Sequence, residues 1–252
     1  MKNKERNIKA VLEYNGLHYF GFQRQPRHKT IQGEFEKALS SLFNQEMKIG
    51  AASGRTDSGV SAKGQTVHFF VNSAMSVQKI RKGLNALLPQ DIAVVRISEV
   101  SKKFHARYSV RSKMYEYQIW NHEVRSPLCD ERSLHFAMKL DVVKMKEAAR
   151  VFLGKHDFKS FCAADPSRSE DRSTIRTIKK LKIIKKGNLI RIQFAADGFL
   201  YKMVRNLTGV LIDVGLAHIS VGEVKSILKA CDRKQASKTA PAKALTLISV
   251  SY

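Results

Sequence analysis

The segment from Gly54 to Gln65 contains the residue types from which a chemical site can be built. It reads Gly54-Arg55-Thr56-Asp57-Ser58-Gly59-Val60-Ser61-Ala62-Lys63-Gly64-Gln65. Glycine lets a backbone turn tightly and approach a ligand closely, and the cations Arg55 and Lys63 supply positive charge for phosphates. This composition predicts a loop in which Asp57 is the only acid. An Asp in a Gly-rich loop commonly hydrogen-bonds its own turn, so composition alone favours a structural role for it.

The whole chain is strongly basic, which indicates a polyanionic partner. Its 252 residues include 45 Lys and Arg but only 22 Asp and Glu, a formal net charge of +23 at pH 7. An excess this large is typical of proteins that bind nucleic acid or an anionic membrane surface. Because no apolar run approaches the roughly 18 residues of a membrane-spanning helix, RNA or DNA is favoured and no membrane partner is expected.

The first residues and the cysteines bear on the compartment. Residues 2–6 are polar and mostly charged, and they lead into a strand-like run without the apolar region of a signal peptide, so a cytoplasmic protein is expected. Cys129, Cys162 and Cys231 lie far apart and form no Cys-x-x-Cys pair. Neither a disulfide framework nor a zinc site is therefore predicted, and reduced, mostly buried thiols are expected.

The elements that must position the Asp57 loop form a predicted N-terminal subdomain, residues 1–103. Thr30 can cap a helix whose apolar residues recur at helical spacing as far as Phe43, and a second helix is predicted at 76–88. Period-two alternation predicts strands at 8–14, 66–71 and 92–97. The order βαβαβ fits an antiparallel or mixed sheet with helices on one face.

A C-terminal subdomain is predicted for residues 104–252. The pattern predicts a strand region at 104–109 that continues through 113–120, a helix at 141–153, a hairpin of 178–184 with 189–194, a long apolar helix at 199–215, a short helix after Ser220 and a final strand at 245–252. Residues 165–176 are polar without a period, which predicts a mobile loop. Its Arg168, Arg172 and Arg176 could reach RNA.

The segment from Tyr14 to Pro26 interleaves aromatic, glycine and amide residues without a regular period, so it is predicted to be a loop. Two interpretations of its aromatics are about equally favoured by the residues alone. They fill a gap between elements, or they stack on unpaired bases beside the amide of Gln23.

The Asp57 segment, together with Val67-His68-Phe69, resembles the signature of TruA-type tRNA pseudouridine synthases. In that family the Asp of this loop is catalytic, so the resemblance implies that Asp57 is the catalytic residue. It also implies that Arg55 holds a phosphate near the target nucleotide. The segment around Gln23 resembles the family's first motif, with Asn15 and Phe22 as departures.

Further motifs in the second half resemble the same family. Tyr115 is the first Tyr of a basic-x-Tyr-x-Tyr motif and is implied to lie against the target uridine, while Arg107 in Phe104-His105-Ala106-Arg107 is implied to contact a phosphate. Arg205 in Met203-Val204-Arg205-Asn206 is implied to pair with the catalytic Asp. Leu245 ends a stretch similar to Ala-Pro-Ala-x-Gly-Leu and is counted among the substrate-binding residues.

The resemblance covers both halves and implies an α+β fold: two α/β subdomains whose antiparallel sheets join into one, helices packed on one side, and a basic active-site cleft between them. It implies a homodimer that isomerises uridine to pseudouridine in the anticodon stem-loop of tRNA, at positions 38, 39 and 40, without metal or cofactor. Two alternatives remain. Ser61 in place of the family's usual His, Ala244 in place of Gly and the high charge suggest a paralogue that modifies other RNA uridines. The second alternative is a non-catalytic RNA-binding module.

Overall fold

Two compact units make up the fold. The structure, a computed structural model, describes residues 5–164 and 173–252. One unit comprises Met1–Arg111 together with Thr246–Tyr252, and the other comprises Ser112–Leu245. This division differs from the ranges 1–103 and 104–252 suggested by the sequence, because the chain before Arg111 is fastened to the first unit and the final strand returns to it.

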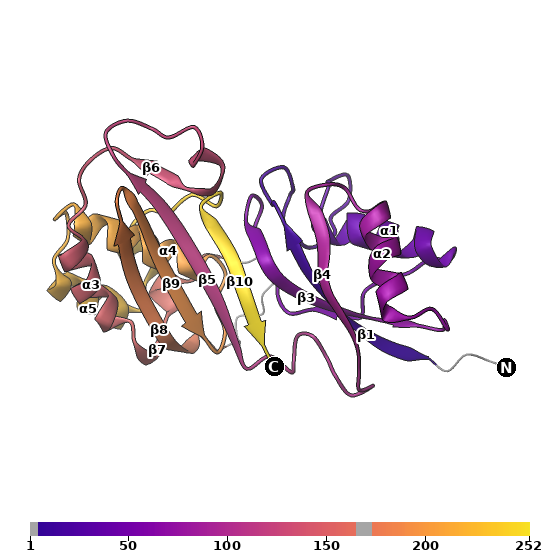
Figure 1. Ribbon diagram of the computed structural model, residues 1–252. Coiled ribbons are helices and arrows are strands. Elements are labelled where there is room, and N and C mark those ends of the chain that lie inside the picture. The colour runs from indigo at the N-terminus through magenta and orange to yellow at the C-terminus, as the bar shows by residue number, and fades with distance from the viewer. Residues whose placement is uncertain (1–4, 165–172) are drawn as a thin grey trace. The chain divides into compact units, whose positions relative to one another are not determined.

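The first unit is a sheet with two helices on one face (Figure 1). Its elements are β1 (Arg6–Tyr14), α1 (Ile31–Phe43), β2 (Ala51–Ala52), β3 (Ser61–Val71), α2 (Val77–Leu87), β4 (Ile92–Val100) and β10 (Leu245–Ser251). The strand order is β4-β1-β3-β10, with β2 paired to β3. β1 is antiparallel to both neighbours, whereas β10 runs parallel to β3 and pairs Thr246 with Ser61.

Alternation along the strands places the core of this unit between the sheet and the helices. Ile8 and Ala10 of β1 are fully buried, and Phe69 of β3 meets Phe35 of α1 edge to face at 6.1 Å. A capping residue marks the start of each helix. The Thr30 hydroxyl accepts the Gly33 N–H at 3.3 Å before α1, and Ser76 caps α2 in the same way. These helices and the three strands predicted for this half are confirmed.

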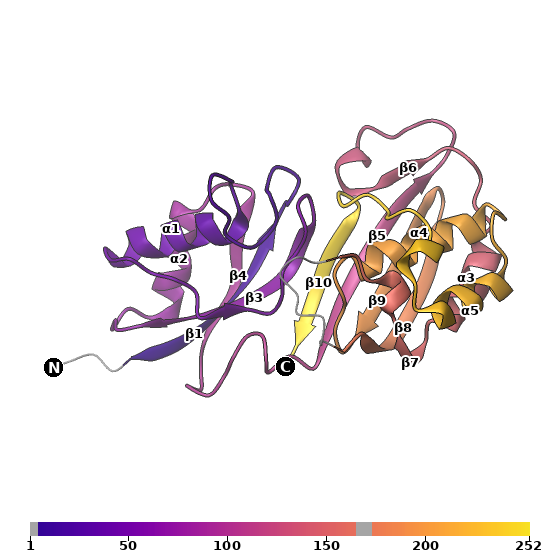
Figure 2. The same cartoon turned by 180° about the vertical axis from the view of Figure 1, so that it is seen from behind.

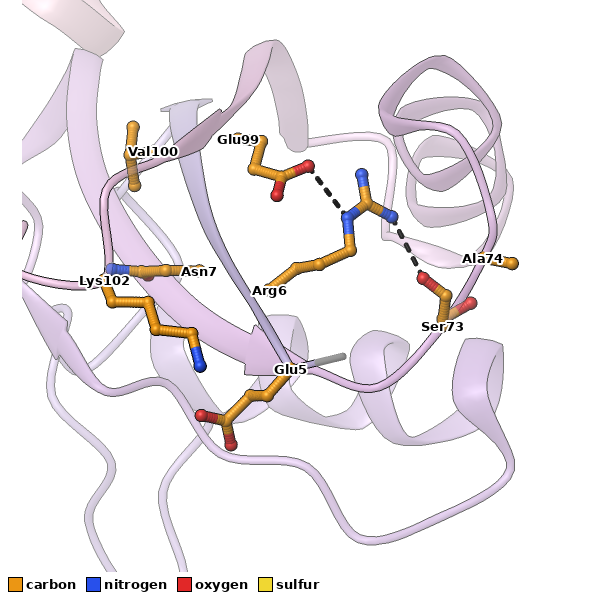
Figure 3. Close-up of a pocket in the computed structure, with 8 residues that line it drawn as sticks. All are labelled: Glu5, Arg6, Asn7, Ser73, Ala74, Glu99, Val100 and Lys102. Carbon is orange, nitrogen blue, oxygen red and sulfur yellow. Dashed lines mark hydrogen bonds and ion pairs between the residues drawn. The ribbon is translucent and has the colours of Figure 1, made fainter. Parts of the chain in front are cut away.

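Arg6 of β1 connects three segments of this unit: β1 itself, β4 and the residues before α2. Its Nε donates to Glu99 of β4 at 2.8 Å, and its Nη1 donates to the Ser73 carbonyl at 3.0 Å (Figure 3). The same Nη1 donates to the Met75 carbonyl at 2.8 Å, just before α2. A planar guanidinium can serve such divergent acceptors because it carries five fixed N–H donors. The connection between β3 and α2 is thereby held against the β1–β4 pair.

The second unit is an antiparallel sheet with helices on one face (Figure 2). Its elements are β5 (Ser112–Asn121), β6 (Leu134–Phe136), α3 (Val142–Val151), β7 (Gly154–Asp157), β8 (Ile175–Lys186), β9 (Leu189–Ala196), α4 (Met203–Gly215) and α5 (Val221–Ala230), with short 3₁₀ turns at Asp130–Arg132, Lys159–Phe161 and Arg233–Gln235. The main strand order is β5-β9-β8-β7, and the short β6 pairs in parallel with β5. The α+β class is confirmed, with mostly antiparallel pairing in both units.

Three sequence predictions are corrected. Residues 104–109 form turns rather than a strand, because the segment is tied to the first unit: Asn7 Nδ2 donates to the carbonyls of Ser101 and Phe104, and Tyr252 donates to the carbonyl of Ala106. α4 begins at Met203 rather than at 199, because Lys202 has φ +56° and interrupts the helical path.

The third correction is that β8 begins at Ile175, so Arg176 lies in a strand and not in a loop. Arg168 and Arg172 lie outside the described residues. The cysteines are free thiols, as expected, but each is only half-buried.

Candidate active site

The Asp57 loop is shorter than its composition suggested, because Ser61–Gln65 already belongs to β3. The strand is forced on these residues by partners distant in sequence: Gln65 faces Leu12 of β1, and Ser61 faces Thr246 of β10. Gly64 is needed here for close approach, since a Cβ at this position would lie 2.7 Å from the Ile248 carbonyl oxygen. The loop proper is therefore residues 53–60.

Gln65, fully buried in β3, closes the base of this loop. Its Oε1 accepts the Ser53 hydroxyl at 2.6 Å, and its Nε2 donates to the Gly54 carbonyl at 2.7 Å. Tyr14, at the end of β1, shares a 2.8 Å hydrogen bond with the Thr56 hydroxyl. Sequence patterns did not assign these supporting roles, although a Gln within an apolar strand run was the available signal.

Backbone groups of the loop of residues 14–26 form hydrogen bonds with the Asp57 loop. The Phe22 N–H donates to the Thr56 carbonyl at 3.1 Å, and the Tyr19 carbonyl accepts from both the Ser58 hydroxyl and the Gly59 N–H. Gly21 has φ +87°, and a Cβ there would lie 2.8 Å from the Thr56 carbonyl oxygen, so only glycine permits this approach. Asp57 itself is half-buried on this fixed support, while Arg55 is exposed beside it.

The aromatics of the 14–26 loop divide between the two sequence interpretations. Tyr19 and Phe22 are buried and fill the space behind the loop. The Tyr19 hydroxyl donates to Asp91 at 2.6 Å, and burial together with that carboxylate raises the pKa of Tyr19 well above its usual range. Phe20 is 52% exposed against the His28 ring, and Gln23 is exposed, so these two side chains remain accessible to a ligand.

Two predicted departures from the family pattern have structural explanations. The Ser61 hydroxyl is buried and accepts the Gly16 N–H at 3.0 Å, so it anchors the 14–26 loop. Ala244 is fully buried in the second unit, and its carbonyl accepts the Gln118 N–H at 3.0 Å. Both residues therefore make structural contacts in this chain.

Arg107 lies in the turns that follow β4. Its side chain is exposed, with the guanidinium 5.8 Å from the Tyr108 ring. The turn is fixed because His105 Nδ1 accepts the N–H groups of Arg107 and Tyr108, each at 3.2 Å. This exposure is compatible with the predicted phosphate contact.

In the second unit, Tyr115 and Tyr117 share the buried face of β5, as alternation predicted. Tyr115 meets Phe199 edge to face at 5.2 Å and keeps 9% of its surface exposed. Tyr117 is fully buried and donates to the Pro241 carbonyl at 3.0 Å. Burial raises the pKa of Tyr117 well above its usual range, and the nearby Arg205 charge opposes that rise.

Arg205 lies in the first turn of α4 and is half-buried. Its Nε donates to the Ala240 carbonyl at 2.7 Å, and the Ala240 N–H returns a bond to the Arg205 carbonyl at 3.2 Å. The segment that ends at Leu245, itself buried, is thereby fastened to the start of α4. Of the residues predicted to form a site, Tyr115, Arg205 and Leu245 belong to the second unit, and Asp57, Arg55, Gln23 and Arg107 belong to the first.

Within residues 5–164 and 173–252 there is no group of three or more His, Cys, Asp or Glu side chains that could hold a metal ion. Among the described residues, no helix is long and apolar enough to cross a membrane.

Comparison with known proteins defines the class. A sequence model of the family described as tRNA pseudouridine synthase matches residues 10–109 and 148–252. A protein named tRNA pseudouridine synthase A from Acetivibrio thermocellus is 39% identical over 247 residues, covering 98% of this chain and all of that protein. Proteins of the same name from Ruminiclostridium cellulolyticum and Clostridium kluyveri are 40% and 42% identical over 248 residues, with 98% of this chain and all of each relative covered.

This similarity over nearly the whole chain defines an isomerase that acts on tRNA. The chain belongs to the tRNA pseudouridine synthase family.

Proposed function

We propose that this protein converts uridine to pseudouridine at positions 38, 39 and 40 of the tRNA anticodon stem-loop, with Asp57 as the catalytic group. The observation that carries the assignment is the support around Asp57. A half-buried carboxylate sits on a loop held by Gln65, Tyr14 and the 14–26 segment, in a chain whose net charge is +23. Asp57 is the only acid of the segment from Gly54 to Gln65, and its charge weakens RNA binding electrostatically, which is reasonable if it has a chemical task.

The reaction needs no oxidant or reductant. The bond from ribose C1′ to uracil N1 breaks, the base turns, and a bond from C1′ to C5 forms; C5 then loses a proton and N1 carries one. A carboxylate can form and release a covalent bond during this exchange, and it accomplishes this best where water is excluded. Asp57 takes this role.

The other site residues have supporting roles in this proposal. Arg205 keeps the carboxylate ionised and oriented, since a nearby cation favours the charged form. Tyr115 stacks on the extruded base or moves a proton. Arg55 and Arg107 hold phosphates while the nucleotide is out of the stack, and Gln23 and Leu245 contact the nucleotide.

The assembly and location belong to the same proposal. We expect a cytoplasmic homodimer that needs no metal or cofactor. Light scattering at micromolar concentration should then give about twice the chain mass of 28.5 kDa, and a mass equal to one chain contradicts the dimer.

The experiment compares wild type with Asp57→Asn on tRNA carrying tritium at uridine C5. Wild type should release tritium and form pseudouridine at 38–40. Asp57→Asn keeps the size of the side chain but removes the nucleophile, so product should disappear while tRNA affinity is retained or slightly increased. The matched control is Glu46→Gln, which removes one negative charge from an exposed surface ion pair with Lys48 and should react normally. Substantial pseudouridine formation by Asp57→Asn overturns the assignment of Asp57.

A further inference from the structure

The first unit carries a pocket of about 360 Å³ that the proposed chemistry does not use. Its lining residues come from β1, β3, β4, β10 and the adjoining α2: Lys9, Val11, Gly64, Thr66, Arg81, Arg96, Ile97, Ser98, Val250 and Tyr252. None of them belongs to the 53–60 loop. Since Ile8 and Ala10 face the helices, Lys9 and Val11 face the opposite side of β1.

The strand register gathers the cations at this pocket. Lys9 lies opposite Ser98, and Val11 lies opposite both Arg96 on β4 and Thr66 on β3. Arg96 is therefore a diagonal neighbour of Lys9 on the same face of an antiparallel pair. Arg81 is added from α2, so three positive side chains line one pocket and no carboxylate does.

No described residue forms an ion pair with any of the three cations. Arg81 and Arg96 are exposed, and neither forms an ion pair or a side-chain hydrogen bond with residues 5–164 or 173–252. Lys9 lies 5.6 Å from the rings of both Phe104 and Tyr252, a cation–π arrangement that fixes the ammonium without cancelling its charge. Like charges held together in this way repel one another unless an anion joins them.

A second pocket on the same unit shows what a neutralised site looks like. It is lined by Arg6 and Lys102 together with Glu5 and Glu99, and the Arg6 donors are already bonded to Glu99, Ser73 and Met75 (Figure 3). Carboxylates therefore balance the positive side chains of that pocket, and no excess positive charge is left for an anion. The pocket at Arg81 and Arg96 has such an excess of positive charge.

The chemistry of the lining selects a phosphate. Two guanidinium groups present planar N–H donors that match phosphate oxygens, Ser98 adds a hydroxyl group, and Val11 and Val250 supply apolar surface that weakens solvent screening. We propose that this pocket binds a backbone phosphate of the tRNA, as a contact additional to those around Asp57. The identity of the RNA rests on the proposed function, whereas the preference for phosphate rests on the pocket.

The test measures tRNA affinity of Arg81→Gln/Arg96→Gln over a range of salt concentrations, in the Asp57→Asn background so that no turnover interferes. Losing one phosphate contact should weaken binding about tenfold at low salt. It should also make the slope of log affinity against log salt shallower by about one. The matched control, Lys37→Gln/Lys79→Gln, removes the same charge from exposed positions on α1 and α2 and should change affinity less than about twofold.

The outcomes separate this proposal from the proposed function. Equal affinities and slopes for the pocket and control variants overturn the phosphate site. The wild-type protein, which retains Asp57, could form no pseudouridine while the pocket variant still binds tRNA more weakly and with a shallower salt dependence. In that case the proposed function fails and the phosphate site stands. Thermal melting of both double variants should match the parent, since all four side chains are exposed.

Discussion

The hydroxyl groups of Tyr14 and Thr56 lie 2.8 Å apart and share a buried hydrogen bond. Tyr14 ends β1, and Thr56 is the residue before Asp57. This bond therefore holds the neighbour of the proposed catalytic carboxylate at the end of a core strand.

Tyr14→Phe should therefore affect turnover more than folding. Removing a buried hydroxyl bond costs about 1 kcal/mol of unfolding free energy, which denaturant titration measures. Because the Asp57 loop loses one of its supports, kcat for pseudouridine formation should fall while tRNA affinity remains. An unchanged kcat in a destabilised Tyr14→Phe protein would show that this bond serves stability alone.

Gly64→Ala should destabilise the first unit. The added Cβ would lie 2.7 Å from the Ile248 carbonyl oxygen and 3.1 Å from Ser249 Cα, so β3 and β10 must move apart. Overpacking of this kind costs roughly 1–3 kcal/mol, measured by denaturant unfolding. Gly222→Ala is the control, since a Cβ there, on α5, approaches nothing closer than 3.7 Å and stability should be retained or slightly raised.

His68 should make stability depend on pH. Burial, and then the neighbouring His105, lower the pKa of His68 below its ordinary value of 6.5, although a hydrogen bond with the Ala51 backbone acts in the opposite direction. Its Nδ1 accepts the Ala106 N–H at 3.2 Å, which requires a ring nitrogen without a proton. His68 therefore binds a proton more tightly in the unfolded chain than in the folded protein.

The His68 contribution is fully present above pH 6.5 and is lost as pH falls through the lowered, folded-state pKa. Unfolding free energy measured by denaturant titration between pH 5 and 7.5 should accordingly decrease on the acid side. The exposed His18→Gln variant should keep this profile, and His68→Gln should flatten it. A profile that His68→Gln leaves unchanged would assign the titration to another group.

Tyr115→Phe separates two roles of the phenol. Its ring packs on Phe199, and Phe can keep that contact. A near-normal rate constant for pseudouridine formation in single-turnover assays implies that Tyr115 acts by stacking on the base. A large decrease of that rate constant with unchanged tRNA affinity implies that the hydroxyl moves a proton.

Local patterns in the sequence predicted the elements that have local causes. Thr30 and Ser76 mark their helix starts, and the alternation around Tyr115 and Tyr117 gives the buried face of β5 correctly. Asp57 was identified through resemblance to a family, since its own neighbourhood favoured a turn. The site assignments stay predictions, and the two units of the structure divide the chain at other residues than the predicted subdomains.

What local patterns could not give depends on partners distant in the chain. Ser61–Gln65 has the composition of a loop, yet pairing with Leu12 and Thr246 makes it a strand. The turns at 104–109 look like a strand in isolation, but hydrogen bonds from Asn7 and Tyr252 hold them in another form. No window of neighbouring residues contains that information.

The parallel pairing of β10 with β3 has a consequence for synthesis on the ribosome. The first unit needs Thr246–Tyr252, yet residues 112–245 are translated in between. Until those last residues emerge, the β3 edge presents unpaired backbone groups, which is the kind of surface that invites intermolecular association. A nascent chain halted anywhere within the second unit therefore carries an incomplete first unit, in which Ser61 and Ala62, directly after the Asp57 loop, still lack their β10 partners.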